Sequence, residues 1–258
     1  MSNNAYLRTI LLQQQLTERQ RAGLARMRQA VEWRIGTLRG SPRIYYAGSY
    51  AKDTMIREKF DLDIVAYWPP ECGHTLFEIY RAVGRRLRKW RKHTRPKTVA
   101  WEIPFSRRFH IDVVPGRAMD NSYRFANLYH RPNSSLQTSI KIHIKTVRDS
   151  GRCDVIKLMK LWRARKRVPL VNSLLLELLT IEGAKRRSYT DLGEQMTAAL
   201  DYIYNNIMTT RVVDPANTNN IVSDELTQKQ RRATRSHARV ALNAKTWNAV
   251  FRLRQTST

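Results

Sequence analysis

Two aspartates that follow a Gly-Ser pair constrain this chain more than any other feature. A short apolar run leads into Gly48-Ser49, and Asp61-Leu62-Asp63 opens a second apolar run. This pattern predicts two strands joined through a tight turn. Because side chains alternate faces along a strand, Asp61 and Asp63 should share one face while Leu62 points into the core. Glycine lets a backbone approach a phosphate closely, and the Ser49 hydroxyl adds a donor.

A third carboxylate changes the interpretation of the Asp-x-Asp pair, which by itself is common on solvated strand ends. Asp112 lies in the apolar run 109–114, where an unpaired carboxylate would be costly, so it needs a basic partner or a metal. Carboxylates gathered on one face repel one another unless a cation lies between them. Mg²⁺, with Mn²⁺ as the alternative, accepts carboxylates and substrate phosphates as ligands. Asp61, Asp63 and Asp112 together therefore indicate two-metal phosphoryl transfer.

The spacing Gly-Ser-x4-Thr, Asp-x-Asp, apolar-Asp-apolar resembles the polymerase-β-type nucleotidyltransferase superfamily. Residues 155–162 and 172–179 are similar to the helical half of one branch, which holds the oligoadenylate synthases, cyclic GMP–AMP synthase with its bacterial DncV-like relatives, and the archaeal CCA-adding enzymes. Residues 212–215, followed by 219–222, resemble a segment near the end of that branch's core. The resemblance covers roughly residues 5–225.

This resemblance implies an α+β fold in which a catalytic sheet lobe with a long N-terminal helix precedes a helical lobe, with the active site in the cleft between them. It implies transfer of a nucleoside monophosphate from a nucleoside triphosphate to a hydroxyl group, with release of pyrophosphate. The implied catalytic and metal-binding residues are Asp61, Asp63 and Asp112, and the implied nucleotide-binding residues are Gly48, Ser49, Lys160, Ser173 and Leu174. Leu174 departs from the family, which often has a base-stacking tyrosine there.

Four nearby polar residues are expected to have less direct roles. His110 is expected to face away from Asp112 and is discounted as a base. Glu177 is expected either to orient a basic neighbour structurally or to contact the ligand. Asp214 should shape its own loop, and Thr54 should buttress the Gly-Ser turn.

The coarse pattern predicts a sheet lobe over residues 1–137 and a helical lobe over 138–258. Apolar residues at steps of three and four predict one long helix over 4–38. Further expected elements are strands near 43–47, 62–68, 97–103 and 108–114, a hairpin turn near Phe105-Ser106, helices over 74–92, 138–149, 153–167, 172–187, 190–208 and 224–253, and a loop over 217–220.

Charge is the second strong signal. The 258 residues include 47 Lys and Arg against 21 Asp and Glu, a formal net charge of +26, which indicates a polyanionic partner. One acid-free run is predicted to contact nucleic acid, as activator or acceptor, through Arg85, Arg86, Arg88, Lys89, Arg91, Lys92, Arg95 and Lys97. A second basic concentration over 229–254 receives no specific role.

Apolar runs and cysteine spacing indicate which classes of protein this chain does not resemble. No apolar run is long enough to span a membrane, and the N-terminus lacks a signal pattern. Cys72 and Cys153 are isolated, so neither a zinc site nor a disulfide framework is expected, and a cytoplasmic setting is favoured. Oligomeric state is not predicted.

Three functions compete. The first is synthesis of a cyclic or short linear oligonucleotide signal of the antiphage type. The second is template-independent addition of nucleotides to an RNA 3′ end, or a tRNA-modifying toxin activity, which the basic charge favours. The third is a catalytically idle nucleic-acid-binding protein. The sequence does not distinguish base preference, 2′–5′ from 3′–5′ linkage, or cyclic from linear product.

Overall fold

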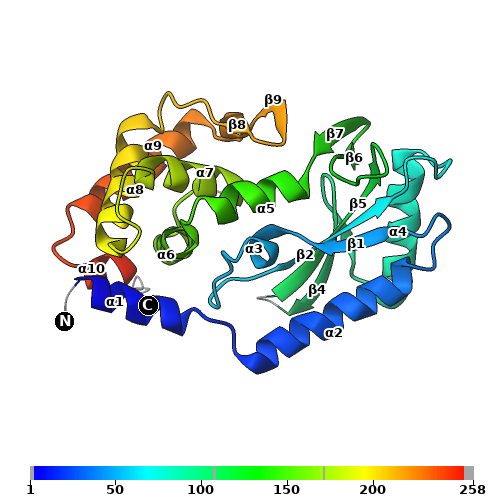
Figure 1. Cartoon of the computed structure of the whole chain (residues 1–258), viewed down its shortest axis with the longest axis horizontal. Coiled ribbons are helices and arrows are strands. Elements are labelled where there is room, and N and C mark those ends of the chain that lie inside the picture. The colour runs from blue at the N-terminus through cyan, green and yellow to red at the C-terminus, as the bar shows by residue number, and fades with distance from the viewer. Residues whose placement is uncertain (1–2, 107–108, 171, 253–258) are drawn as a thin grey trace. The chain divides into compact units, whose positions relative to one another are not determined.

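The structure is a computed structural model that describes residues 3–106, 109–170 and 172–252 (Figure 1). The chain forms two compact units. The helical unit comprises Met1–Gln15, Ile56–Glu58 and Thr146–Thr258, and the sheet unit comprises Leu16–Met55 and Lys59–Lys145. None of the helices in the described ranges combines the length and the apolar character that a bilayer span requires.

The sheet unit contains seven strands and the helices that cover them. Its elements are α2 (Glu18–Ile35), β1 (Arg43–Tyr46), α3 (Gly48–Ala51), β2 (Leu62–Trp68), α4 (Leu76–Trp90), β3 (Arg95–Pro96), β4 (Trp101–Ser106), β5 (Phe109–Ala118), β6 (Ala126–His130) and β7 (Ser134–Thr138), with α5 (Ile140–Asp149) crossing into the helical unit. The strand order is β1-β2-β5-β4-β3, and β6 joins β5 and β7. Strands β2 and β5 are parallel, and the other pairs are antiparallel.

The two faces of β2 have different environments, as its alternating pattern predicts. Leu62, Ile64 and Ala66 are fully buried in one core cluster with Val31 of α2 and Val83 of α4. The other face carries Asp63 at its start, followed by Val65 and Tyr67, which are buried in a separate core cluster. Because residues alternate faces, the burial of Leu62 and Ile64 fixes which way the Asp63 carboxylate points.

The predicted single N-terminal helix is wrong. Helix α1 (Asn3–Gln13) ends before α2 begins, and Thr17 accepts a hydrogen bond from the Gln20 backbone while the Gln20 side chain accepts one from the Thr17 backbone. This reciprocal capping box is a strong helix start, and it separates α1, in the helical unit, from α2, in the sheet unit.

The helical unit is built around one apolar core. Its elements are α1, α6 (Cys153–Lys166), α7 (Ser173–Ala184), α8 (Leu192–Asn206), β8 (Val213–Asp214), β9 (Asn217–Ile221), a 3₁₀ turn (Val222–Glu225), α9 (Gln228–Leu242) and α10 (Trp247–Phe251). Trp162 is only 1% exposed at the centre of this core.

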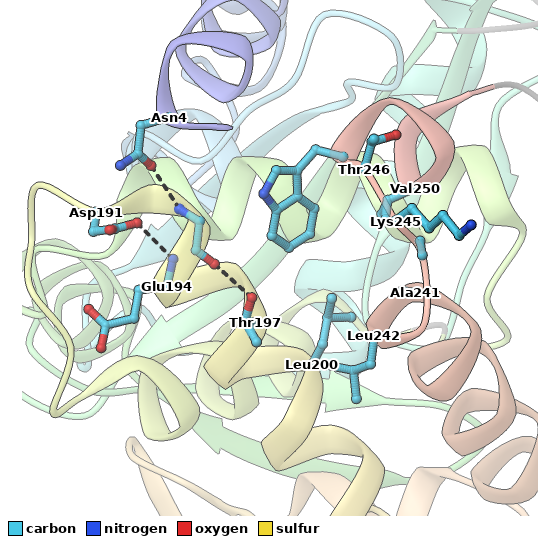
Figure 2. Close-up of a pocket in the computed structure, with 13 residues that line it drawn as sticks. Asn4, Asp191, Glu194, Thr197, Leu200, Ala241, Leu242, Lys245, Thr246 and Val250 are labelled. Carbon is cyan, nitrogen blue, oxygen red and sulfur yellow. Dashed lines mark hydrogen bonds between the residues drawn. The ribbon is translucent and has the colours of Figure 1, made fainter. Parts of the chain in front are cut away.

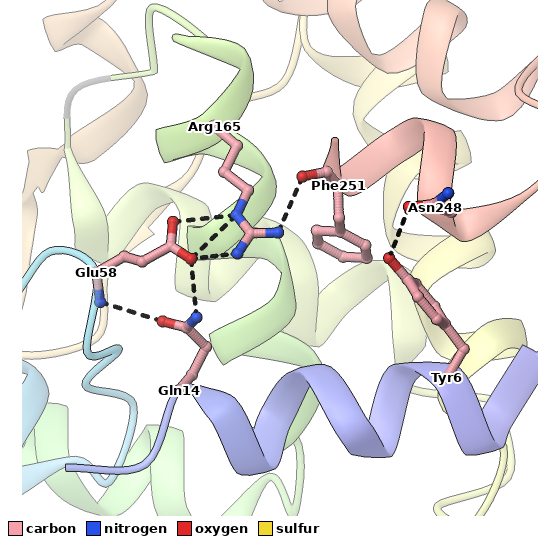
Figure 3. Close-up of polar contacts among 6 residues, drawn as sticks. All are labelled: Tyr6, Gln14, Glu58, Arg165, Asn248 and Phe251. Carbon is pink, nitrogen blue, oxygen red and sulfur yellow. Dashed lines mark hydrogen bonds and ion pairs between the residues drawn. The ribbon is translucent and has the colours of Figure 1, made fainter. Parts of the chain in front are cut away.

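The segment Ile56–Glu58 also belongs to the helical unit. Glu58 accepts hydrogen bonds from the guanidinium of Arg165 and from the amide of Gln14 (Figure 3). Arg165 also donates to the Phe251 carbonyl oxygen at 2.9 Å, so one guanidinium joins α6, α10 and this segment.

Most predicted elements are present with shifted ends. Strands β4 and β5 form the predicted hairpin, but Phe105 and Ser106 belong to β4, and the residues that connect the two strands lie outside the described residues. The predicted loop over 217–220 is wrong, because those residues form β9. The predicted helix 224–253 is divided into the 3₁₀ turn, α9 and α10, and residue 253 lies outside the described residues. Strands β6 and β7 were not expected from the sequence.

Candidate active site

The acidic residues of the sheet unit meet across three adjacent strands. Asp63 of β2 lies directly opposite Asp112 of β5 in the parallel pair, and Glu102 of β4 lies opposite Asp112 in the antiparallel pair. Side chains at paired positions point to the same face of a sheet. The Asp63 and Asp112 carboxylates are therefore neighbours, and Glu102 adds an acidic group that the sequence analysis did not select.

The Gly-Ser pair lies against this acidic face. The Ala47 backbone N–H donates to the Asp63 carbonyl oxygen at 2.9 Å, which holds the start of α3 beside β2. Gly48 has φ +56°, and a Cβ placed there would lie 1.6 Å from Asp63 Oδ2. Thr54 is fully buried, and its backbone N–H donates to the Ser49 carbonyl oxygen at 2.9 Å, which agrees with a buttressing role. Only glycine leaves room for the Asp63 carboxylate in this position.

Replacing Gly48 by alanine is expected to displace the Asp63 carboxylate and to destabilise the protein. A left-handed backbone conformation costs an L-residue about 1–2 kcal/mol, and the overlap with Asp63 adds to that cost. Gly73→Ala is the matched control, because Gly73 has φ +69° and open space around its Cβ position. Thermal unfolding should show the larger loss of stability for Gly48→Ala, and equal losses would contradict the proposed close packing.

Burial and like charge combine at Asp63. Burial, together with the nearby Asp112 and Asp61 carboxylates, raises the pKa of the Asp63 carboxyl to about 6, and burial is the largest of these causes. Lys52 and Lys97 oppose this shift. Asp63 is thus held ionised near neutral pH at a free-energy cost, which an added cation would relieve.

Two basic side chains partly neutralise the acidic face. Lys97 Nζ lies 2.5 Å from Asp112 Oδ2 and 3.7 Å from Glu102 Oε2. His110 Nδ1 lies 2.8 Å from Asp61 Oδ1, and His110 Nε2 lies 3.7 Å from Asp112 Oδ2. Hydrogen bonds that His110 donates to the Asp112 and Asp61 carboxylates raise the pKa of His110 to about 10. Burial tends to raise the pKa of Asp112, but His110 and Lys97 outweigh it and lower that pKa overall.

The expectation that His110 faces away from Asp112 is therefore wrong. The two residues are two positions apart on β5, and residues two apart on a strand share a face. Lys97, which the sequence analysis assigned to nucleic acid, also lies at this site.

The donor set fits a hard divalent cation. Asp112 Oδ1 is buried and has no hydrogen-bond partner among the described residues, although Oδ2 of the same carboxylate contacts Lys97. One ligand atom from each of Glu102, His110 and Asp112 lies within 4.8 Å of the others. A buried carboxylate oxygen without a partner is costly, and metal coordination is one way to satisfy it.

Of the nucleotide-binding residues predicted in the helical unit, Lys160 lies in the middle of α6, and Ser173 and Leu174 are the first two residues of α7. Lys160 Nζ lies 2.6 Å from Glu177 Oε1, and the two residues are 4% and 1% exposed. Arg163 donates to Ser173 Oγ at 3.0 Å, and Leu174 packs against the helical core. Glu177 thus orients a basic neighbour, one of its two expected roles, and the contact of Lys160 with a nucleotide stays a prediction.

Asp214 shapes its loop, as expected. Its carboxylate accepts hydrogen bonds from the Ala216 backbone at 2.8 Å and from the Asn220 side chain at 3.0 Å. These contacts close the turn between β8 and β9.

The basic run 85–97 divides into two groups in the structure. Arg86 donates to Thr37, Arg88 stacks on Trp101, Arg91 stacks on Phe105, and Arg95 and Lys97 pair with Glu102. The remaining members of the run are exposed, with no hydrogen bond or ion pair to another described residue: Arg85, Lys89 and Lys92.

A pocket of about 440 Å³ lies in the helical unit among α1, α8 and α10 (Figure 2). Trp247 forms one wall, and Asn4 accepts a hydrogen bond from the Gly193 backbone at 3.0 Å. Among the described residues that line this pocket, none is a predicted site residue.

Comparison with known proteins identifies the fold. No protein-family model matches the sequence, and no curated protein matches it. The solved structure of CdnC from E. coli MS115-1 with ATP matches with a TM-score of 0.74 at 20% identity, covering 97% of this chain and 98% of that one. CdnG from Bradyrhizobium diazoefficiens, a CD-NTase in complex with GTP, matches with a TM-score of 0.77 at 16% identity, over 93% and 90% of the two chains.

A third structure is the cyclic AMP-GMP synthase DncV from Vibrio cholerae in complex with the linear intermediate pppA(3′,5′)pG. It matches with a TM-score of 0.76 at 17% identity, over 95% of this chain and 93% of that one. The chain therefore has the α+β fold of the bacterial CD-NTases. The resemblance to the branch of cyclic GMP–AMP synthase and its bacterial relatives is confirmed at the level of the fold.

Proposed function

We propose that this protein is a Mg²⁺-dependent nucleotidyltransferase that transfers a nucleoside monophosphate from a nucleoside triphosphate to a hydroxyl group and releases pyrophosphate. One observation carries the proposal: Asp63 and Asp112 are paired across parallel strands, with Gly48 packed on Asp63 and a partnerless buried oxygen on Asp112. The product that best fits the matched structures is a cyclic or short linear oligonucleotide signal, of the kind used against phage.

Each residue has a proposed task. Asp61, Asp63 and Asp112 hold Mg²⁺, or Mn²⁺ as the alternative, which when bound neutralises phosphate charge and favours ionisation of the attacking hydroxyl. Gly48 lets the backbone approach the terminal phosphates, and Ser49 donates its hydroxyl and backbone N–H to them.

The helical unit supplies the other proposed contacts with nucleotide. Lys160, oriented by its ion pair with Glu177, binds the triphosphate, and Ser173 at the start of α7 donates to a phosphate. Leu174 packs on the base but cannot stack as an aromatic ring does, so base selection is expected to be weak at this position.

The direct test is incubation of the pure protein with labelled nucleoside triphosphates and Mg²⁺, with and without total tRNA or duplex nucleic acid. Resolved small oligonucleotide products support the proposed synthase. Label transferred to tRNA instead supports the RNA-modifying alternative, which the net charge of +26 favours.

A catalytically idle protein is the third candidate, because Lys97 and His110 already supply positive charge to the carboxylates. Absence of product with either Mg²⁺ or Mn²⁺, together with retained nucleic-acid binding, would establish it. The partnerless Asp112 oxygen favours the active enzyme over this candidate. A cytoplasmic location is proposed because the two cysteines of the chain, Cys72 and Cys153, form no disulfide with each other.

The exposed part of the basic run is proposed to bind nucleic acid. Replacing Arg85, Lys89 and Lys92 by glutamine should weaken duplex DNA binding and reduce the slope of log K against log salt by about 2–3, at roughly 0.9 per lost phosphate contact. Titrations at several salt concentrations measure this slope.

The control for that variant carries the same loss of charge elsewhere, at the exposed residues Arg148, Arg186 and Lys245 of the helical unit. An equal change of slope in both variants would show that net charge, rather than this run, governs the binding.

A further inference from the structure

Helix α9 has a strongly basic exposed face for which the proposed catalysis has no use. Its fifteen residues, Gln228–Leu242, contain no acidic residue. Arg232, Arg235 and Arg239 are exposed and follow one another at steps of three and four, so they share one side of the helix. At a rise of about 1.5 Å per residue, this row extends about 10 Å.

These three arginines line a groove of about 500 Å³. The groove also includes Ser236 of α9, together with Tyr204 of α8 and Met208 just after it. The groove therefore combines guanidinium groups with an aromatic ring and an apolar thioether, all from the helical unit.

The groove is held in place by the residues beneath it. Arg231 is 7% exposed and donates to the backbone carbonyl oxygens of Ile207 at 2.7 Å and Ser223 at 2.6 Å. Arg235 donates to the Tyr204 carbonyl oxygen at 3.1 Å, and its guanidinium carbon lies 4.9 Å from the centroid of the Tyr204 ring. Arg235 is thus oriented in advance of any ligand, which reduces the entropy lost on binding.

The groove arginines lack ion pairs with carboxylates in the described part of the chain. Elsewhere in the same unit Arg187 pairs with Glu194 at 3.2 Å, and Arg165 pairs with Glu58. Three neighbouring cations without an acid repel one another, and a bound polyanion would relieve that repulsion.

We propose that the groove between α8 and α9 binds the phosphates of a single-stranded nucleic-acid segment. The row of arginines is longer than one phosphate requires, and Tyr204 with Met208 supplies a surface on which a base can pack. A basic groove beside an aromatic side chain is the general arrangement for single-strand binding. This proposal does not depend on the proposed catalytic activity.

The test is fluorescence anisotropy of the whole protein with a labelled twelve-nucleotide oligo(dT) over a range of salt concentrations. Replacing Arg232, Arg235 and Arg239 by glutamine should lower the salt slope by about 2, at roughly 0.7 per contact, and the affinity by about 100-fold at 0.1 M salt. Because Arg235 also bonds to α8, the double variant Arg232→Gln, Arg239→Gln is measured alongside and should show a smaller loss in the same direction.

The charge-matched variant at Arg148, Arg186 and Lys245 should retain most of the binding. Equal loss in that variant would overturn the proposal, as would an unchanged slope in a triple variant whose thermal unfolding matches the parent protein. Competition with ATP distinguishes a site for a nucleic-acid strand from a site for a free nucleotide. Complete displacement of the oligonucleotide by stoichiometric ATP would show a mononucleotide site and overturn the strand assignment.

Discussion

Asp63→Asn is expected to abolish nucleotide transfer, with a fall in kcat/KM of at least about 10³-fold. Charge stabilisation by a bound metal contributes several kcal/mol to such a reaction, and each 1.36 kcal/mol is a factor of ten in rate. Asparagine has the shape of aspartate, so the close contact with Gly48 is preserved while the anionic ligand is lost. The measurement is the yield of labelled product at saturating Mg²⁺.

The same substitution should leave the fold intact and increase stability at alkaline pH. The folded-state pKa of Asp63 is raised to about 6 from 3.8, so its proton stabilises the folded protein fully below about pH 4. That contribution is lost as pH rises through 6, where the carboxylate must ionise beside Asp112 and Asp61. Asparagine never ionises, so thermal unfolding of the variant at pH 8 should occur at or above the parent temperature.

The control is the same change at Asp201, an exposed residue of α8 that bonds only its neighbour Asn205 among the described residues. Asp201→Asn should retain activity. Normal turnover by Asp63→Asn, with the control equally active, would refute the assignment of this carboxylate to the metal.

The strands that carry the acidic residues were predictable because their apolar faces are continuous. Leu62 and Ile64 flank Asp63 on β2, and their burial requires the Asp63 carboxylate to point to the opposite face. The parallel register that pairs Asp63 with Asp112 is a tertiary property, which the local pattern of either strand does not contain. The sequence analysis inferred from the chemistry of the three aspartates that they meet, but it did not predict this register.

The positions of Glu102 and Lys97 at the site were not predicted from the sequence. Glu102 enters because the hairpin pairs it with Asp112, whereas a residue-by-residue count across the predicted turn at Phe105-Ser106 would have paired Asp112 with Val99. Lys97 belonged to a run that was treated as one basic surface, but the structure turns it toward Asp112 and leaves Lys89 exposed. A run of basic residues therefore shows only where positive charge is concentrated in the sequence. Which of its members form ion pairs depends on the strand that lies opposite each of them.

The break between α1 and α2 has a local cause that was visible in the sequence. Thr17 and Gln20 have the spacing of a capping box, but the apolar periodicity across them suggested a continuous helix. Here the side-chain bonds at the start of α2 outweighed the periodic pattern.

Lys160→Ala should destabilise the helical unit by about 3–5 kcal/mol, because it leaves the buried Glu177 carboxylate without its ammonium partner. For a chain of this size, that loss corresponds to roughly 6–20 °C in the midpoint of thermal unfolding. Replacing both partners by apolar residues, Lys160→Met with Glu177→Leu, removes both charges and should recover most of the stability. Thermal unfolding of the single and double variants measures the difference.

The double variant also distinguishes the effect of Lys160 on stability from its effect on nucleotide binding. If Lys160 binds the triphosphate, the restored fold should still show a weakened enzyme, with kcat/KM lowered roughly 30- to 150-fold, equivalent to about 2–3 kcal/mol of lost charged hydrogen bonding. Much of that loss should occur in KM for the nucleotide, because an ammonium on the triphosphate stabilises the bound substrate as well as the transition state.

Lys160→Arg should rescue poorly, since a planar guanidinium does not occupy the space of an ammonium beside Glu177. A stable double variant with parental KM and kcat would confine Lys160 to a structural role, and the roles of Ser173 and Leu174, which rest on the same alignment, would be withdrawn with it.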